Sequence, residues 1–115
     1  MKQSNVHKYI LKISKGNKKE EKELIRIFIA DMNKQVGCLE KGMEENDWKS
    51  IKIALCCVKS CFIFSGESKP LLLSDKIFNR VKRNHKNIAK KHIVELNRIC
   101  IKEVGYFERL QKKHS

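Results

Sequence analysis

The residue in this chain whose type is best suited to chemistry is Cys56, in the middle of a segment with helical periodicity. A thiolate is a strong nucleophile, although a free thiol is mostly protonated at neutral pH. Lys52 lies four residues before Cys56 and Lys59 three residues after it. On a helix both ammonium groups would lie near the sulfur and favour the thiolate. The spacing therefore allows group-transfer chemistry at Cys56.

The other cysteines do not form a metal or redox motif. The chain has five cysteines, an odd number, and no pair has the C-x-x-C spacing; they are Cys38, Cys56, Cys57, Cys61 and Cys100. Two cysteines four residues apart on one helix do not provide tetrahedral geometry without further ligands. We expect no metal and no cofactor. Free thiols and the lack of a recognisable secretory signal predict a reduced, cytoplasmic protein.

Apolar residues recur at every third or fourth position, which predicts helices. Asn17 and Asp47 are suitable N-caps, Gly66 suits a helix C-terminus and Pro70 the first turn of a helix. The predicted helices span about residues 5–14, 18–45, 47–65, 70–84 and 87–113. The predicted fold is all-α: an antiparallel four-helix bundle with a short N-terminal helix, in a single domain covering residues 1–115.

The predicted helix 47–65 presents Cys56 to solvent. Its buried face is formed by Trp48, Ile51, Leu55, Val58 and Phe62. At 100° per residue, Cys56 points roughly 130° away from the centre of that face. Lys59 and Ile63 share the flank of Cys56, and Gly66 lies near the end of the same helix. These residues form a candidate contact patch.

The segment from Cys56 to Gly66 resembles the signature of histidine-phosphotransfer (HPt) domains of two-component phosphorelays. That signature has a histidine, any residue, an aliphatic residue, a lysine and a small residue, with a glycine ten positions after the histidine. The matching residues here are Cys56, Cys57, Val58, Lys59, Ser60 and Gly66. Residues 9–17, 23–28 and 47–48 are similar to the flanks of such domains. The resemblance covers most of the chain up to about Gly66 and fades after Pro70.

The chain departs from the family at the residue that carries the phosphoryl group. In the family an exposed histidine accepts phosphate from a receiver aspartate, the lysine offsets the phosphoryl charge, and the small residue and the glycine let the receiver approach. Here Cys56 occupies the histidine position. The four histidines are His7, His85, His92 and His114, and none lies on this helix.

The resemblance implies a signalling module rather than an enzyme. It would dock the receiver domain of a response regulator or of a hybrid histidine kinase without relaying phosphate through histidine, and so act as a competitor or adaptor. The implied docking residues are Lys52, Cys56, Lys59, Ser60, Ile63 and Gly66. A first alternative is phosphotransfer through Cys56 itself, assisted by the two lysines.

The charge distribution leaves an alternative of another class, a basic helical module that binds nucleic acid. The formal net charge is +13, and from Lys76 onward there are twelve Lys or Arg against three Glu. These cations bracket a predicted turn instead of following one long face, and no nucleic-acid-binding motif is present. We therefore do not expect nucleic acid as a partner. The longest apolar run, residues 53–58, is too short to cross a membrane, and we expect a monomer that does not insert into one.

Overall fold

Five helices make up residues 3–113, the part of the chain that this computed structural model describes. They are α1 (Asn5–Ser14), α2 (Lys18–Glu45), α3 (Trp48–Phe62), α4 (Ser68–Lys82) and α5 (Lys86–Lys113). No strand occurs within residues 3–113, so the prediction of an all-α fold is confirmed. One of the four histidines, His114, lies outside the described residues.

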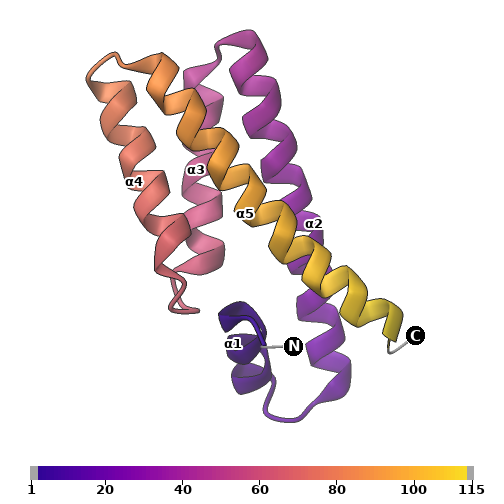
Figure 1. The fold of residues 1–115 in the computed structure, drawn as a ribbon. Helices are drawn as coiled ribbons and strands as arrows, with labels where there is room; N and C mark the ends of the chain where they lie inside the picture. The colour runs from indigo at the N-terminus through magenta and orange to yellow at the C-terminus, as the bar shows by residue number, and fades with distance from the viewer. Residues whose placement is uncertain (1–2, 114–115) are drawn as a thin grey trace.

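The four longer helices lie side by side, and successive helices run in opposite directions (Figure 1). Helix α2 contacts α3 and α5, and α4 contacts the same two helices. The elongated molecule measures 47 × 23 × 23 Å. Helix α1 packs on α2 and lies near the end where α3 and α5 terminate.

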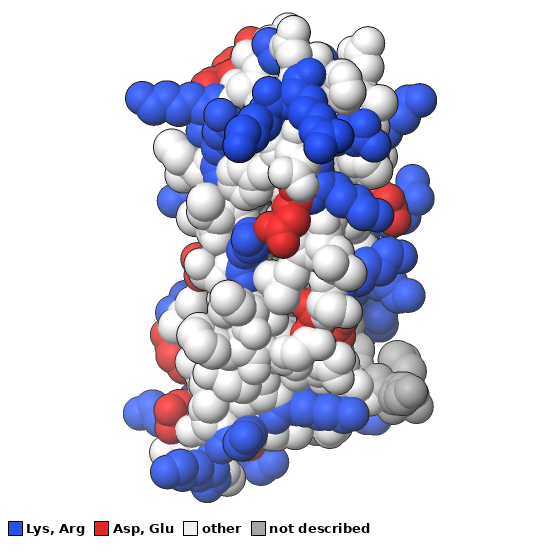
Figure 2. All heavy atoms as spheres, turned by 90° about the vertical axis from the view of Figure 1, so that its left-hand side faces the viewer, with Lys and Arg blue, Asp and Glu red and all other residues white. Residues whose placement is uncertain are grey.

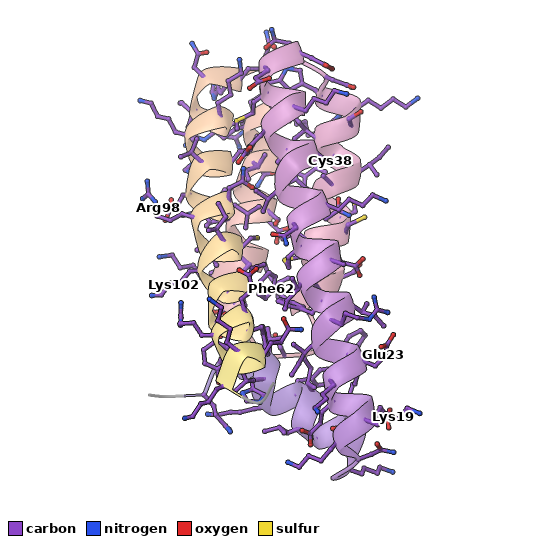
Figure 3. The ribbon with its side chains drawn as sticks, turned by 90° about the vertical axis from the view of Figure 1, so that its right-hand side faces the viewer. Lys19, Glu23, Cys38, Phe62, Arg98 and Lys102 are labelled. Carbon is purple, nitrogen blue, oxygen red and sulfur yellow. The ribbon has the colours of Figure 1, made fainter. Side chains whose placement is uncertain are left out.

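The core is formed by the apolar stripes that the periodicity predicts. Figure 3 shows Phe62 between the helices, whereas Arg98 and Lys102 project from α5 into solvent. The Phe28 ring meets the rings of Phe62 and Phe107 edge-on, at centroid distances of 6.1 and 5.2 Å. Such geometry adds to the stabilisation that burial of aromatic area already provides. The three rings join α2, α3 and α5.

The two predicted N-caps are confirmed. The Asn17 side-chain oxygen accepts a hydrogen bond from the Glu20 amide at 3.0 Å. The Asp47 carboxylate accepts from the Ser50 amide at 3.1 Å and from the Ser50 hydroxyl at 2.6 Å. These two hydrogen bonds lower the pKa of Asp47, because they stabilise its charged form. The cap at Asp47 defines where α3 begins, and thereby which way Cys56 points.

Helix α3 ends at Phe62, three residues before the predicted end at residue 65. The Ser65 side chain and amide both donate to the Phe62 carbonyl, at 2.7 and 3.1 Å, and so replace the helical pattern with a turn. Gly66 has a φ of +79°, a left-handed conformation that favours glycine. Helix α4 then begins at Ser68 instead of residue 70, with Pro70 in its first turn, where no backbone N–H is needed.

The turn between α4 and α5 covers residues 83–85, whereas the predicted helices left residues 85–86 between them. Asn84 adopts a left-handed φ of +61°. The Asn84 amide donates to the Val81 carbonyl and the His85 amide to the Arg80 carbonyl, at 3.0 and 2.7 Å. This pattern is a Schellman motif with asparagine in the position usually taken by glycine. It ends α4 two residues before the predicted position.

Helix α1 is attached through both apolar and polar contacts. Val6 and Ile10 are buried, and the Ser4 hydroxyl caps the helix by accepting from the His7 amide at 3.0 Å. The His7 ring nitrogen Nδ1 lies 2.6 Å from the Tyr106 hydroxyl of α5, a contact between residues 99 positions apart. These contacts hold α1 on the end of the helices, close to the end of α3.

Candidate functional site

The solvent face of α3 carries most of the predicted docking residues in one row. Lys52, Cys56, Ser60 and Ile63 are all exposed, at spacings of three and four residues. Ile53, which the prediction did not include, is 60% exposed beside them. The row therefore mixes charged, polar and apolar side chains on one helix face. Its apolar members are accessible to a partner.

Cys56 is the one exposed cysteine of the five, all of which lie in the described part of the chain. The Ser60 hydroxyl donates to the Cys56 backbone carbonyl at 3.0 Å. Ser60 is thus engaged with the backbone one turn away, and its small side chain leaves the thiol of Cys56 uncovered. The predicted exposure of Cys56 is confirmed.

Lys59 lies at the edge of the row and forms an ion pair that the sequence analysis did not anticipate. Its ammonium donates to the Asp75 carboxylate of α4 at 2.8 Å. The side chains of Lys59 and Asp75 remain 34% and 57% exposed, respectively. Lys59 was expected to offset negative charge beside Cys56. Its ammonium is instead already paired with the Asp75 carboxylate. No local sequence signal indicates this pair, because its members are 16 residues apart on different helices.

The row ends in a group of exposed apolar side chains. Ile63 and Phe64 are 53% and 73% exposed. The Phe64 ring stacks on Tyr9 of α1, with centroids 6.3 Å apart and an interplanar angle of 18°. Gly66 is exposed, and a Cβ atom added there would have open space around it. The predicted Gly66 position is thus open to an approaching surface, and Phe64 and Tyr9 extend the patch beyond the predicted residues.

Two of the other thiols, those of Cys61 and Cys100, are unsuited to nucleophilic chemistry. Burial, together with the nearby Asp31 carboxylate and Cys57, raises the pKa of Cys61 to about 11. Burial in the core raises the pKa of Cys100 to about 12. Both thiols are therefore protonated at neutral pH. Within residues 3–113, no three His, Cys, Asp or Glu side chains are arranged so that they could hold a metal ion.

The described histidines lie away from the α3 row. His7 is on α1 and contacts Tyr106, His85 is in the turn before α5, and His92 is on α5. The α3 position that the resemblance matches to the family's histidine therefore has the thiol of Cys56 as its side chain, with no described histidine on the same helix.

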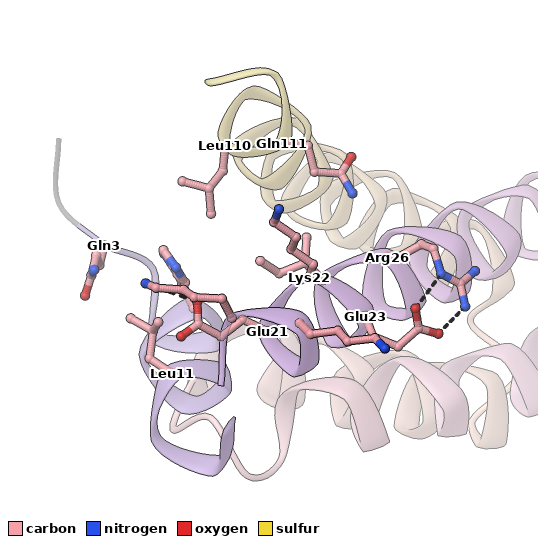
Figure 4. A pocket seen from close by; sticks show the side chains of 12 residues that line it. Gln3, Leu11, Glu21, Lys22, Glu23, Arg26, Leu110 and Gln111 are labelled. Atoms are coloured by element: carbon pink, nitrogen blue, oxygen red, sulfur yellow. Dashed lines mark hydrogen bonds and ion pairs between the residues drawn. The ribbon is translucent and has the colours of Figure 1, made fainter. Parts of the chain in front are cut away.

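A cleft lies at a different part of the surface from Cys56. It has a volume of about 1000 Å³ and is bounded by α1, the start of α2 and the end of α5 (Figure 4). Much of its charge is already paired, since Lys18 contacts Glu21 at 3.8 Å and the Arg26 guanidinium contacts the Glu23 carboxylate. None of the predicted docking residues lines this cleft.

The α4 side of the molecule is divided by charge. Figure 2 shows Lys and Arg side chains gathered toward the end where α4 meets α5, and a broad uncharged area in the lower half of the same face.

No helix among the described residues is both long enough and apolar enough to cross a membrane.

Comparisons with known proteins identify no relative of this chain: no family model, no curated protein and no solved structure matches it. The case for a function therefore depends on the residues and geometry described above.

Proposed function

We propose that this chain is an HPt-like docking module of the two-component phosphorelay type. In this proposal α2, α3, α4 and α5 form the antiparallel four-helix bundle of such domains, and α1 is the short additional helix. The partner is the receiver domain of a response regulator or of a hybrid histidine kinase. The partner binds the α3 row centred on Cys56, and the module acts as a competitor or adaptor.

The observation that carries the proposal is the composition of the exposed row. Cys56 lies among accessible apolar side chains, Ile53 and Ile63, which are 60% and 53% exposed. Exposed apolar groups that lie together on a surface are typical of protein-interaction sites. Their position around the residue that matches the family's phosphoacceptor supports docking on this face. The excess of positive charge also favours an acidic partner surface.

The side chains around Cys56 argue against a histidine-type relay. The acceptor position has a thiol, and the charge of Lys59 is offset by Asp75. A phosphoryl group on this helix would have to compete with Asp75 for the ammonium of Lys59. The proposal therefore assigns the chain a binding role and no catalytic one. It also places the protein in the cytoplasm, where thiols stay reduced, in accordance with five free cysteines.

A phosphoryl-transfer assay tests the proposal directly. The wild type, Cys56→Ser and Cys56→His are each mixed with a panel of receiver domains that carry radiolabelled phosphate. We expect label only on Cys56→His, because the scaffold would dock receivers but lacks the acceptor imidazole. Label on the wild type but not on Cys56→Ser would show that Cys56 is a thiol-based relay. If no variant acquires label, the proposal loses its main support.

A binding experiment with matched variants tests the docking face separately. Ile63, directly after the end of α3, and Ile101 on α5 have nearly equal exposure, 53% and 54%, so their substitution by glutamate perturbs the surface to the same degree. Ile63→Glu should weaken receiver binding by about tenfold or more, since it places a charge among the exposed apolar side chains at the end of the row. Ile101→Glu should leave binding unchanged. Equal effects of the two substitutions, or no binding by the wild type at micromolar concentrations, would contradict the proposal.

A further inference from the structure

A second surface feature, a small basic pocket, lies between α4 and α5. It has a volume of about 270 Å³ and is lined by Lys76, Asn79 and Arg80 of α4, by Arg83 at the start of the following turn, and by His92 of α5. It belongs to the α4–α5 side of the molecule and includes none of the residues of the α3 row. Its chemistry is therefore independent of the docking proposal.

The pocket concentrates positive charge without acidic residues in its lining. Lys76, Arg80 and Arg83 follow one another at spacings of four and three residues, so their side chains share one face of α4. Like charges at such spacings destabilise a helix unless they are offset. An anion bound between them would relieve that repulsion.

The nearest carboxylates on the same helices point to other partners. Asp75, which precedes Lys76, contacts Lys59 of α3 at 2.8 Å. Glu95, three residues after His92, contacts Lys69 at 3.8 Å. These two acidic groups therefore do not offset the charge of the pocket.

The structure also orients the central guanidinium. Arg80 is half-buried, and its Nη1 lies 3.3 Å from the ring nitrogen Nδ1 of His85. The His85 amide in turn donates to the Arg80 carbonyl, as part of the turn that ends α4. Preorganisation of this kind reduces the entropy lost when a ligand binds. The Asn79 amide adds a neutral donor beside the cations.

We propose that this pocket binds an anionic ligand that has one or two phosphate groups. Guanidinium groups match phosphate oxygens with two parallel hydrogen bonds, which makes arginine well suited to this ligand. The volume of about 270 Å³ is below the range of roughly 300–1000 Å³ that is usual for sites of organic ligands. A small inorganic anion or a single phosphodiester segment fits this size better than a bulky organic molecule does.

Titration with pyrophosphate at low ionic strength tests the proposal, with binding followed by calorimetry or by amide chemical shifts. The double variant Arg80→Gln/Arg83→Gln removes two charges from the pocket. The control Lys82→Gln/Lys91→Gln removes two exposed charges from the same two helices outside the pocket lining. We expect about tenfold or greater loss of affinity in the pocket variant and less than about twofold loss in the control. Equal losses in both would overturn the proposal, because they would indicate diffuse attraction alone.

A conservative variant distinguishes the pocket geometry from charge and folding effects. Arg80→Lys keeps the charge but removes the planar fork, so pyrophosphate should bind more weakly, while the midpoint of thermal unfolding should stay near that of the wild type. Unchanged affinity in Arg80→Lys would contradict the bidentate geometry that the proposal requires.

A parallel titration with a short single-stranded oligonucleotide identifies the source of the phosphate. If the pocket variant loses affinity for pyrophosphate, and the oligonucleotide binds equally to the pocket variant and the control, the ligand is a free phosphate. If oligonucleotide binding also falls only in the pocket variant, the pocket holds a backbone phosphate. The absence of pocket-dependent binding for both probes overturns the proposal. None of these results depends on Cys56, so failure here is distinguishable from failure of the docking proposal.

Discussion

The ammonium of Lys59 on α3 lies 2.8 Å from the Asp75 carboxylate on α4, which links a lysine one turn beyond the exposed Cys56 to the neighbouring helix. On α3, Lys59 is one turn beyond Cys56, so the two side chains lie on adjacent parts of the same face. The pairing changes the electrostatic surroundings of Cys56, because it offsets a positive charge that would otherwise attract an anionic group to this face. Asp75 is therefore the residue through which the chemistry of this face can be adjusted.

Removal of the Asp75 charge should speed the labelling of Cys56 by an anionic reagent. In Asp75→Asn a negative charge beside the α3 face is removed and the ammonium of Lys59 is no longer offset, so the anionic reagent iodoacetate should label Cys56 about two to three times faster. The stability cost should be below about 1 kcal/mol, because the ion pair is largely exposed. Labelling kinetics followed by mass spectrometry measure the effect. Glu95→Gln, which breaks the Lys69–Glu95 contact instead, should leave the rate at Cys56 unchanged; an equal acceleration there would disprove the local explanation.

The five cysteines should differ widely in reactivity in the folded protein. Cys56 is exposed, whereas Cys100 is fully buried and its pKa is raised to about 12. Alkylation at pH 8 should therefore modify Cys56 at least about a hundredfold faster than Cys100. Cys61, with a pKa raised to about 11, should also react slowly. Peptide mapping after timed alkylation measures the order, which should vanish in denaturant. Comparable rates for Cys56 and Cys100 in the folded protein would contradict the burial of Cys100 in the core.

Two glycines of α2 should respond oppositely to substitution by alanine. A Cβ atom on Gly42 would lie 2.6 Å from Cγ1 of Ile51, a fully buried side chain of α3. Gly42→Ala should therefore destabilise the protein by about 1–3 kcal/mol through overpacking. Gly37 is exposed on the same helix and has open space around it, so Gly37→Ala should stabilise by about 0.5–1 kcal/mol.

Urea unfolding of these two alanine variants measures both free energies. Because the substitutions are chemically identical, the helix propensity gained is the same in both. The difference between them therefore reports the contact of Gly42 with Ile51. Stabilisation of similar size at both positions would show that α2 and α3 are farther apart near their connecting turn than the structure indicates.

The fold followed closely from the sequence because its determinants are local. The apolar periodicity located α2 to within its observed ends, and the caps at Asn17 and Asp47 depend on residues three positions apart. The end of α3 was predicted less well, since Ser65 competes for the Phe62 carbonyl and periodicity does not report such competition.

The candidate site was predictable only in part. Exposure of Cys56 and Ile63 followed from helical geometry within one element. The Lys59–Asp75 pair and the basic pocket depend on how α4 is rotated and shifted against α3 and α5. Side-chain packing between the helices sets this rotation and shift, and the sequence pattern of one helix does not predict them directly.

Glu103 of α5 should make the stability of the protein depend on pH. Burial raises the pKa of Glu103 above its ordinary value of 4.5; a hydrogen bond with Ser4 and the charge of Lys102 lower it, and the nearby Glu67 raises it. Because the folded-state pKa exceeds the unfolded-state value, the folded protein binds the proton more tightly. The resulting contribution to stability is complete below about pH 4.5 and is lost as the pH rises through the raised pKa.

Substitution by glutamine isolates this effect. Glu103→Gln has no proton to lose, so its free energy of unfolding should exceed that of the wild type increasingly as the pH rises from 4 to 7. Denaturant titrations of both proteins over this range measure the difference. Glu108→Gln, at an exposed position of the same helix, is the control and should show no such trend. A difference that is constant with pH would show that the Glu103 carboxylate is ionised normally in the folded protein.

The stacking of Tyr9 on Phe64 has a thermodynamic consequence for the whole α3 face. Phe64 is adjacent to Ile63, so the apolar end of the row is complete only while α1 is docked. A partner that touches this end binds the docked state more tightly than a state with α1 released. By reciprocity, the partner must then hold α1 in place by the same factor by which docked α1 strengthens partner binding. Helix α1 is thus an internal ligand of the surface, and its attachment and the affinity for the partner are one linked equilibrium.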